Sequence, residues 1–324
     1  MTPLRIGLLG ASRIAPKATI EPAAARDDVR VVAVAARDPG RAQAFAQAHG
    51  IGGVASSYAE LVTRDDVDLV YNALPPAAHL EWTVAALEGG KAVLCEKPFA
   101  RNAGEAATMV AAAERTGLML MEAFHYRHHR VMYDAVALIR AGGIGRPLSA
   151  EGVFEVPIAR TETELRWRAD QGGGALMDLG CYPLHALRTL LNAEPVVRAA
   201  EAAWVDGVDA RLAADLDLAG VPARLSCSMT PSAPGARLTV VGERGRLEIV
   251  NFIAPQIGCR FTVEQDGRDL AQSTDGPTTY AAQLDHVVNC WRGDVRPLLD
   301  GTDAVANMTA IDALYAAAGQ RPIA

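Results

Sequence analysis

The chain is poor in cysteine, in aromatic residues and in long hydrophobic runs, and it has no excess of basic residues. Its five cysteines stand singly along 324 residues, which fits neither a disulfide framework nor a paired-cysteine zinc or redox motif. Acidic residues outnumber basic ones, 38 to 31, so we do not expect the basic stripe that binds nucleic acid. No apolar run approaches the ~20 residues of a membrane-spanning helix, and the amino terminus has no signal-peptide pattern. These absences favour a cytoplasmic protein with reduced thiols and a small-molecule partner.

The length of the chain and the order of its sequence patterns predict two domains. In the first third, short apolar runs alternate with helical patterns, which is typical of a parallel sheet with crossover helices. The expected strands are residues 4–9, 29–35, 69–74, 92–95 and 118–121. Capping patterns at Asp38-Pro39, at Ser57 with Glu60, and at Asn102 with Glu105 mark the starts of helices between them.

Beyond residue 125 the pattern changes. After an expected helix at 131–141, β-type runs follow one another at 148–156, 196–204, 213–218, 223–229, 237–241 and 245–250, which favours a mostly antiparallel sheet. A helix at 175–191 interrupts this sheet, and helices at 280–291 and 303–318 finish the chain. We predict an α/β protein: a Rossmann domain with a doubly wound parallel sheet at 1–124, and an α+β domain with a large, mostly antiparallel open-faced sheet at 125–324. The last helix can return to the first domain.

The first expected strand runs into a turn of small residues, Gly10-Ala11-Ser12-Arg13-Ile14-Ala15. A dinucleotide-binding fold places its phosphate-binding turn here, because backbone N–H groups and a helix N-terminus must approach the pyrophosphate closely. Gly10 fills the first glycine position, whereas Ser12 and Ala15 replace the second and third. The turn therefore indicates a dinucleotide site, with an ordinary strand-to-helix turn as the alternative.

The end of the second expected strand discriminates between NAD and NADP. An acidic residue at this point would accept the ribose hydroxyls of NAD, but the chain has Arg37 there, followed by Asp38. A guanidinium group matches a 2′-phosphate, and Ser12 or Arg13 can add donors. Because Asp38 is well placed to cap the next helix, NADP is favoured over NAD. The alternative is that Arg37 is only a solvated side chain.

Two segments carry the candidate reactive groups. Glu96-Lys97-Pro98 follows the fourth expected strand at the carboxyl edge of the sheet, where open α/β folds bind their ligands. The second segment runs from Gly172-Gly173-Gly174 to His185. Within it, Asp178, Tyr182 and His185 are four and three residues apart, so one helix face can present all three.

These segments, with the glycine turn and Met121-Glu122-Ala123-Phe124, make the chain similar to the glucose–fructose oxidoreductase/inositol dehydrogenase/rhizopine catabolism (Gfo/Idh/MocA) family over nearly its whole length. Ala33-Val34-Ala35-Ala36-Arg37-Asp38 and Val93-Leu94-Cys95-Glu96-Lys97-Pro98 most resemble its NADP-dependent dihydrodiol and D-xylose dehydrogenase branch. The resemblance implies an NADP-dependent oxidoreductase that moves a hydride between nicotinamide and a sugar or related polyhydroxylated alcohol or ketone.

The resemblance also implies the catalytic groups. Lys97, before a cis peptide bond to Pro98, would polarise the substrate oxygen, and Tyr182 from the second domain would exchange its proton. Tyr182 stands where the inositol dehydrogenase branch has histidine, which disfavours inositol. Asp178 would orient Lys97 or a substrate hydroxyl, and His185 would be a second proton carrier. The structural alternatives are a surface lysine, a core aromatic residue, a helix cap and a core histidine respectively.

The remaining implied contacts belong to the cofactor and the substrate. The cofactor contacts are Gly10, Ser12, Arg13, Ile14, Ala36, Arg37, Leu74, Pro75, His79, Glu96, Lys97, Pro98, Trp167 and Arg168. The substrate contacts are Lys97, His125, Arg127, Asp178 and Tyr182, with His125 standing where the dihydrodiol branch has tryptophan. The run His125-Tyr126-Arg127-His128-His129 is not predicted to bind metal, since neighbouring side chains diverge on a strand or a helix.

Three alternatives stay open. The protein can be an aldose–aldose or glucose–fructose type oxidoreductase that keeps its NADP bound, or a trans-dihydrodiol dehydrogenase. From a different class, it can be an NADP-dependent sensor without turnover, although Lys97 and Tyr182 argue against this. Self-association as a homodimer or homotetramer through the second sheet is expected in each case.

Overall fold

The computed structural model describes residues 2–265 and 267–319, which fall into two compact units. The first unit comprises the chain up to Phe124 together with Tyr280–Val305. The second comprises His125–Thr279 and resumes at Ala306. Among the described residues, no helix has both the length and the apolar character needed to cross a bilayer.

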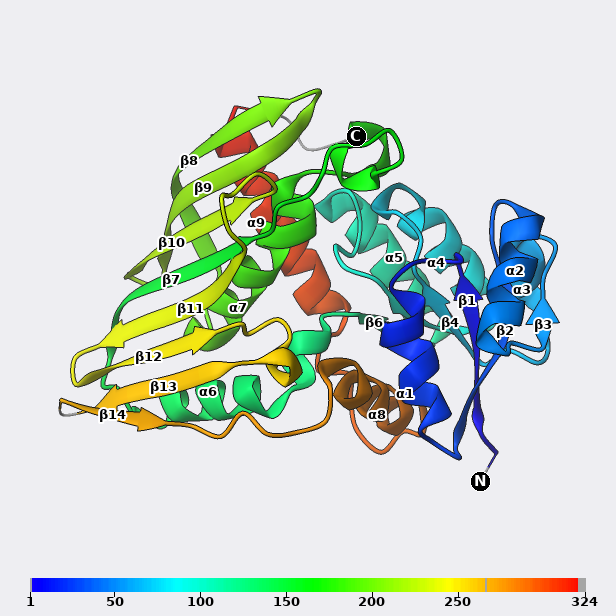
Figure 1. Ribbon diagram of the computed structural model, residues 1–324, viewed down its shortest axis with the longest axis horizontal. Helices are drawn as coiled ribbons and strands as arrows, with labels where there is room; N and C mark the ends of the chain where they lie inside the picture. The colour runs from blue at the N-terminus through cyan, green and yellow to red at the C-terminus, as the bar shows by residue number, and fades with distance from the viewer. Residues whose placement is uncertain (1, 266, 320–324) are drawn as a thin grey trace. The chain divides into compact units, whose positions relative to one another are not determined.

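The first unit is built on a six-stranded parallel sheet in the order β3-β2-β1-β4-β5-β6 (Figure 1). Its strands are β1 (Leu4–Leu9), β2 (Val29–Ala35), β3 (Gly53–Val54), β4 (Leu69–Asn72), β5 (Ala92–Cys95) and β6 (Leu120–Glu122). The strand order reverses between β1 and β4, as in a doubly wound fold, and this is the point where such sheets bind ligands. The predicted Rossmann architecture is therefore confirmed.

Helices pack around these strands, and three of them, α2, α3 and α5, begin at the predicted capping residues. The helices are α1 (Glu21–Ala24), α2 (Pro39–His49), α3 (Tyr58–Thr63), α4 (His79–Glu88), α5 (Ala103–Thr116) and α8 (Thr279–Trp291). Each of Asp38, Ser57 and Asn102 accepts a hydrogen bond from a backbone N–H in the first turn of its helix. A π-type turn, Pro16–Ile20, precedes α1.

Ion pairs fasten the returning C-terminal segment to the first unit. Arg292, just after α8, binds Asp28 at 2.8 Å, and Arg26 binds both Asp28, at 2.8 Å, and Asp285 of α8, at 2.9 Å. The two guanidinium groups hold the pKa of Asp28 below its ordinary value, with the hydrogen bond from Arg26 as the largest cause. Asp28 is thus the centre of the charged contacts between α8 and the start of β2.

The second unit contains an eight-stranded sheet in the order β14-β13-β12-β11-β7-β10-β9-β8, antiparallel except between β7 and β10. Its strands are β7 (Pro147–Glu155), β8 (Pro195–Val205), β9 (Val208–Leu218), β10 (Val221–Ser228), β11 (Gly235–Gly242), β12 (Gly245–Val250), β13 (Arg260–Gln265) and β14 (Arg268–Ala271). The mostly antiparallel, open-faced sheet predicted from the sequence is confirmed.

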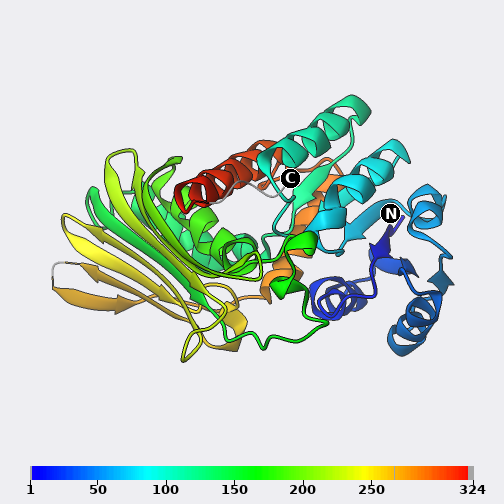
Figure 2. The ribbon, with the colours of Figure 1, turned by 90° about the horizontal axis from the view of Figure 1, so that it is seen from above.

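Helices cover one face of this sheet and leave the other face open (Figures 1 and 2). Helix α7 (Cys181–Leu191) packs on β7, β10 and β11, and α6 (Arg130–Arg140) packs on α7. Residues of the strands alternate accordingly: Ala223, Leu225 and Cys227 of β10 are buried, whereas Pro222 and Arg224 point to the open face. Helix α9 (Gly301–Ala317) begins in the first unit and continues in the second.

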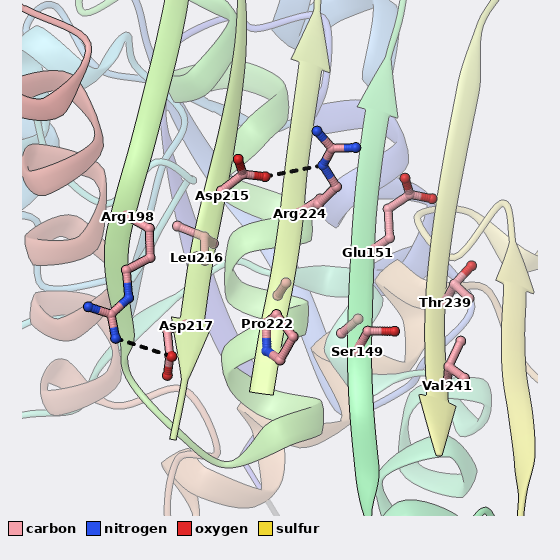
Figure 3. A pocket seen from close by; sticks show the side chains of 12 residues that line it. Ser149, Glu151, Arg198, Asp215, Leu216, Asp217, Pro222, Arg224, Thr239 and Val241 are labelled. Atoms are coloured by element: carbon pink, nitrogen blue, oxygen red, sulfur yellow. Dashed lines mark hydrogen bonds and ion pairs between the residues drawn. The ribbon is translucent and has the colours of Figure 1, made fainter. Parts of the chain in front are cut away.

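The open face carries cross-strand ion pairs around a hollow of roughly 510 Å³ (Figure 3). Arg198 binds Asp217 at 3.2 Å, and Arg224 binds Asp215 at 3.1 Å. None of the residues lining this hollow belongs to the predicted site, and the side chains of α7 lie on the other face of the sheet. The hollow is therefore not the candidate active site.

The structure differs from the sequence predictions in three places. The expected helix at 175–191 is a π-type turn, Leu176–Gly180, that leads into α7. Strand β4 ends at Asn72 instead of residue 74, because its neighbours β1 and β5 end opposite Asn72, at Leu9 and Cys95. Strands β3, β13 and β14 were not predicted; β3 has two residues and β14 is exposed along its length, so neither carries a clear apolar pattern.

Candidate active site

The glycine turn after β1 packs closely against the loop that follows β4. Gly10 has φ +98°, and a Cβ atom on it would lie 3.2 Å from Leu74 Cδ2 and 3.3 Å from the Ala73 carbonyl oxygen. Beyond it, the Ser12 hydroxyl accepts a hydrogen bond from Ala15 N at 3.2 Å. The first glycine is therefore indispensable, and Ser12 braces the turn where the motif has its second glycine.

At the end of β2, the Arg37 side chain is exposed, whereas the carboxylate of Asp38 is already hydrogen-bonded. Asp38 accepts the Arg41 N–H at 2.7 Å as the cap of α2, while Arg37 is exposed. The guanidinium group of Arg41 donates to the Ala11 carbonyl at 2.8 Å and so ties α2 to the glycine turn. Sequence reasoning missed this role of Arg41, which has no local signal.

The segment that carries Lys97 is held in place by the buried carboxylate of Glu96, the residue directly before it. The Tyr71 hydroxyl of β4 donates to Glu96 Oε1 at 2.6 Å, and Lys97 N donates to Glu96 Oε2 at 3.2 Å. The Lys97–Pro98 peptide bond is cis, as the family resemblance implies. Glu96 is 8 % exposed, so its carboxylate acts inside the unit, and Tyr71 is a site residue that the sequence did not reveal.

His79 joins the Lys97 segment to the loop beside the glycine turn. Its ring is fully buried, with Nε2 2.8 Å from the Leu74 carbonyl oxygen and Nδ1 3.1 Å from that of Pro98. Leu74 is also the residue that a side chain at Gly10 would touch. Since both nitrogens face backbone carbonyls, His79 braces two loops, and its predicted contact with the cofactor stays a prediction.

In the second unit, Tyr182 lies in a cluster of aromatic and imidazole rings. Its hydroxyl is 3.2 Å from His125 Nε2, and His125 Nδ1 is 2.8 Å from the Thr279 hydroxyl. The Tyr126 hydroxyl is 2.6 Å from Nδ1 of His185. All five side chains are buried, so the structure brings the predicted residues Tyr182, His185 and His125 together and adds Tyr126 and Thr279.

Asp178 is held in an ion pair with Arg166. Arg166 Nε donates to Asp178 Oδ2 at 2.6 Å, and Arg166 also binds Glu164 at 3.1 Å. The Coulombic attraction of Asp178 is the largest cause that raises the pKa of Arg166. Sequence spacing placed Asp178 on the Tyr182 face but did not reveal Arg166, which is its partner.

The loop before the triple glycine has local partners for both residues predicted to reach the cofactor. The Trp167 ring is 9 % exposed and donates from Nε1 to the Ile158 carbonyl at 3.2 Å. The Arg168 guanidinium binds Asp170 at 2.7 Å. Cofactor contacts by Trp167 and Arg168 stay predictions, as do those of Ile14, Ala36 and Pro75 and the substrate contact of Arg127.

A buried carboxylate holds the triple glycine against the turn that leads to Tyr182. Asp209 accepts Leu176 N at 2.7 Å and the Tyr315 hydroxyl at 2.8 Å. Gly174 has φ +131°, and a Cβ atom there would lie 2.2 Å from Asp209 Oδ1. Burial raises the pKa of Asp209 to about 6 in spite of these donors. Asp209 was not predicted, because β9 gives no sign that one of its acids points inward.

The described parts of the chain contain no group of three or more histidine, cysteine, aspartate or glutamate side chains arranged to hold a metal ion. Within the histidine run, His125 faces Tyr182 and Thr279, and His129 Nδ1 accepts the Val131 N–H at the start of α6. His125 and His129 of this run therefore have different hydrogen-bond partners.

Comparison with known proteins identifies the family. Residues 4–124 match the oxidoreductase family with an NAD-binding Rossmann fold, and residues 133–248 match the Gfo/Idh/MocA C-terminal domain. The chain is also 32 % identical to D-xylose 1-dehydrogenase (NADP(+)) 2 of Haloferax volcanii over 97 % of both chains. The protein belongs to the Gfo/Idh/MocA family. The resemblance inferred from its motifs is thus confirmed.

Solved structures of other proteins agree with this membership. The aldose–aldose oxidoreductase of Caulobacter crescentus, complexed with glycerol, superposes with a TM-score of 0.89 at 26 % identity, over 98 % of this chain and 97 % of that one. KijD10, a 3-ketoreductase of Actinomadura kijaniata in complex with NADP and TDP-benzene, gives 0.89 at 28 % identity, over 99 % and 98 %. The Gfo/Idh/MocA fold therefore extends over nearly all of the chain.

Proposed function

We propose that this Gfo/Idh/MocA protein is an NADP-dependent oxidoreductase that interconverts a CH–OH group and a carbonyl group on a sugar or related polyhydroxylated compound. One observation carries the proposal: a side chain at Gly10 would touch Leu74, and His79 joins Leu74 to Pro98, next to Lys97. A dinucleotide turn and a reactive ammonium are thus parts of one braced loop system at the carboxyl edge of the parallel sheet. The relatives named above act on sugars or use NADP, in keeping with this assignment.

The residues present fit NADP. The turn that begins at Gly10 follows β1 at the carboxyl edge of the parallel sheet and would hold the pyrophosphate, with Ser12 and Arg13 as further donors. Arg37 is exposed and binds the 2′-phosphate, while Asp38 is occupied by the N-terminus of α2. When bound, NADP supplies or accepts the hydride.

The chain's own residues hold the substrate oxygen and move a proton. Lys97 donates a hydrogen bond to that oxygen and stabilises the negative charge that develops on it. Tyr182 takes the proton of the alcohol during oxidation and returns it to the carbonyl oxygen during reduction. Replacing either Lys97 or Tyr182 should therefore slow turnover.

A second candidate is a Gfo/Idh/MocA oxidoreductase that keeps NADP bound and transfers hydride between two sugars. The likeness to the Caulobacter aldose–aldose oxidoreductase favours it. The purified protein would then show nicotinamide absorbance without added cofactor, and its steady-state kinetics with two sugars would be of the ping-pong type.

The deciding experiment is a panel of aldoses, cyclic polyols, diols and keto-sugars, assayed with NADP⁺ and NADPH by nicotinamide absorbance. We expect turnover with a sugar or polyol class and weaker activity with NAD⁺. Turnover only with trans-dihydrodiols would instead identify a dihydrodiol dehydrogenase. Saturable NADPH binding without redox change across the panel would contradict the proposal and favour the sensor.

We also propose that the enzyme works in the cytoplasm and self-associates through the open face of its eight-stranded sheet. All five cysteines are free, and burial raises the pKa of the Cys259 and Cys290 thiols to about 11, so they suit a reducing compartment. The paired charges of the open face can meet their equivalents in a second copy. Light scattering on the wild-type protein and on Arg224→Glu distinguishes a homodimer or homotetramer from a monomer.

A further inference from the structure

His125 connects Tyr182 to Thr279 by two hydrogen bonds, one at each ring nitrogen. Its Nε2 lies 3.2 Å from the Tyr182 hydroxyl, and its Nδ1 lies 2.8 Å from the Thr279 hydroxyl. Its side chain is 3 % exposed, that of Tyr182 is 5 % exposed and that of Thr279 is fully buried. Three residues that are far apart in the sequence thus form one continuous hydrogen-bonded row.

This row gives His125 a task other than the substrate contact predicted from the sequence. A neutral imidazole has one N–H donor and one nitrogen acceptor. In the tautomer whose Nδ1–H donates to the threonine hydroxyl, Nε2 is the acceptor that faces the phenol. Both nitrogens are already hydrogen-bonded inside the second unit, and the acceptor faces the only atom of Tyr182 that can exchange a proton.

Resting on the function proposed above, we propose that His125 is the proton partner of Tyr182, a positioning residue that takes and returns the phenol proton while Thr279 fixes its tautomer. During oxidation the alcohol proton moves to Tyr182 Oη as the Tyr182 proton moves to His125 Nε2. The hydride moves to NADP⁺ from the carbon atom that carries the alcohol group. A carbonyl compound and an imidazolium ion on His125 remain. The imidazolium ion then releases its proton to solvent, and reduction runs these steps in reverse.

The neighbouring groups make this assignment specific. Tyr126 and His185 form a second phenol–imidazole pair, with 2.6 Å between Oη and Nδ1, and the rings of Tyr126 and Tyr182 are 5.7 Å apart. The Tyr182 hydroxyl thus lies at hydrogen-bond distance from the imidazole of His125, and the imidazole of His185 lies at hydrogen-bond distance from the Tyr126 hydroxyl. Phe154, on the other side of the Tyr182 ring at 5.6 Å, offers no proton acceptor.

Nitrogen NMR on histidine-labelled protein tests the geometry without any substrate. We expect the Nδ1–H tautomer for His125, and we expect Tyr182→Phe to move the Nε2 resonance of His125. The resonances of His49, which is exposed at the end of α2, should stay in place. An Nε2–H tautomer, or an Nε2 resonance that ignores Tyr182→Phe, would overturn the proposal.

Kinetics test the proton transfer. His125→Gln keeps a polar group of similar size but cannot carry the proton, so kcat should fall about 10- to 100-fold with little change in KM. In His125→Ala, added imidazole should restore much of the lost kcat, which a packing role would not predict. Thr279→Val should lower kcat less, and His49→Gln should leave it unchanged.

A wild-type kcat in His125→Gln, or a His125→Ala enzyme that imidazole leaves equally slow, contradicts the relay. Circular dichroism of each variant separates these results from loss of folding. If the wild-type protein turns over nothing in the substrate panel, the proposed function fails, while the NMR result still decides whether His125 is paired to Tyr182 as described.

Discussion

The two units support their reactive groups in different ways. In the first unit, Lys97 lies on a loop at a sheet edge, and that loop is held mainly through backbone atoms: the carbonyl groups of Leu74 and Pro98 meet His79, and Lys97 N meets Glu96. In the second unit, Tyr182 lies at the start of a helix, and its hydroxyl is held by the side chain of His125.

This difference determines how many side chains of each unit can be substituted without loss of activity. Backbone contacts depend on the course of the chain and tolerate a change of side chain nearby. Contacts between rings depend on particular side chains that come from distant parts of the sequence, so one substitution removes them. The lysine half should therefore tolerate changes in the loop's own side chains other than Lys97, as long as His79 and Glu96 remain, whereas the tyrosine half should be sensitive at each ring of the cluster.

The largest expected effect is that of Lys97→Met. Loss of the ammonium removes the group that stabilises charge on the substrate oxygen, so kcat/KM should fall about 1,000-fold. NADPH binding, followed by fluorescence, should change little because the loop is held by its backbone. Lys17→Met, which removes an exposed lysine of the same unit, is the control. Unchanged turnover in Lys97→Met would reject the catalytic assignment.

Gly174→Ala should be the most damaging change in the support of the tyrosine half. A Cβ atom would lie 2.2 Å from Asp209 Oδ1 at φ +131°, so the free energy of unfolding should fall by about 2–4 kcal/mol. Chemical denaturation at pH 7 measures this loss.

Gly90→Ala is its matched control in the first unit. Gly90 has φ +81°, but a Cβ atom there would meet nothing within 4 Å. Only the backbone strain of about 1–2 kcal/mol should therefore remain. Equal losses in the two variants would mean that the close approach of Asp209 to Gly174 is unimportant.

Arg37→Ala tests cofactor selection in the first unit. Removing the guanidinium group should weaken NADP⁺ binding about 10- to 100-fold, since a charge-assisted hydrogen bond to phosphate is lost. NAD⁺ binding should not weaken, because NAD⁺ lacks the 2′-phosphate. Isothermal titration of both cofactors checks this, with Arg224→Ala on the open sheet face as the control. Equal weakening for both cofactors would remove Arg37 from the 2′-phosphate site.

The smallest effect concerns acid stability, where one carboxylate in each unit should behave oppositely. The pKa of Asp28 is lowered by Arg26 and Arg292, so its contribution is present above the unfolded pKa near 4 and disappears as the pH falls through the folded value. Because Asp28 is partly exposed, we expect Asp28→Asn to cost only about 1 kcal/mol at pH 7 and less at pH 2. Urea unfolding at several pH values measures it.

Asp209 provides the contrast in the second unit. Its folded pKa of about 6 lies above the unfolded value, so its protonated form is favoured in the folded protein, and the free energy of unfolding falls as the pH rises from about 4 to about 6. Because an asparagine side chain cannot ionise, the free energy of unfolding of Asp209→Asn should not fall over this pH range. If the free energy of unfolding of the variant fell by the same amount, titratable groups other than Asp209 would be the cause.

Local patterns in the sequence account for much of the first unit. Asp38, Ser57 and Asn102 cap their helices as predicted, and the strands β1, β2 and β5 have the expected bounds. These features depend on residues within a few positions of one another, so the sequence displays them directly. The Lys97 segment was equally visible, because its motif is contiguous.

The supports of the site were not visible for the opposite reason. Arg166 meets Asp178 across a turn, Tyr71 meets Glu96 from another strand, and Asp209 meets Gly174 and Tyr315 from distant segments. His79 shows the same limit, because its position after β4 predicted a cofactor contact but did not reveal that its buried ring joins the Leu74 and Pro98 carbonyl groups. Spacing along the chain carries no information about such partners.

The sequence by itself determined the fold class, the family, the place of the dinucleotide turn and the identities of Lys97 and Tyr182, since contiguous motifs and hydrophobic periodicity encode them. Only the tertiary structure decided which side chains hold these groups. It placed His125 against Tyr182 and Thr279, His79 between two loops, and Asp209 under the triple glycine. The physical reason is that a buried polar group must find a partner wherever the fold provides one, and that partner is seldom a neighbour in the sequence.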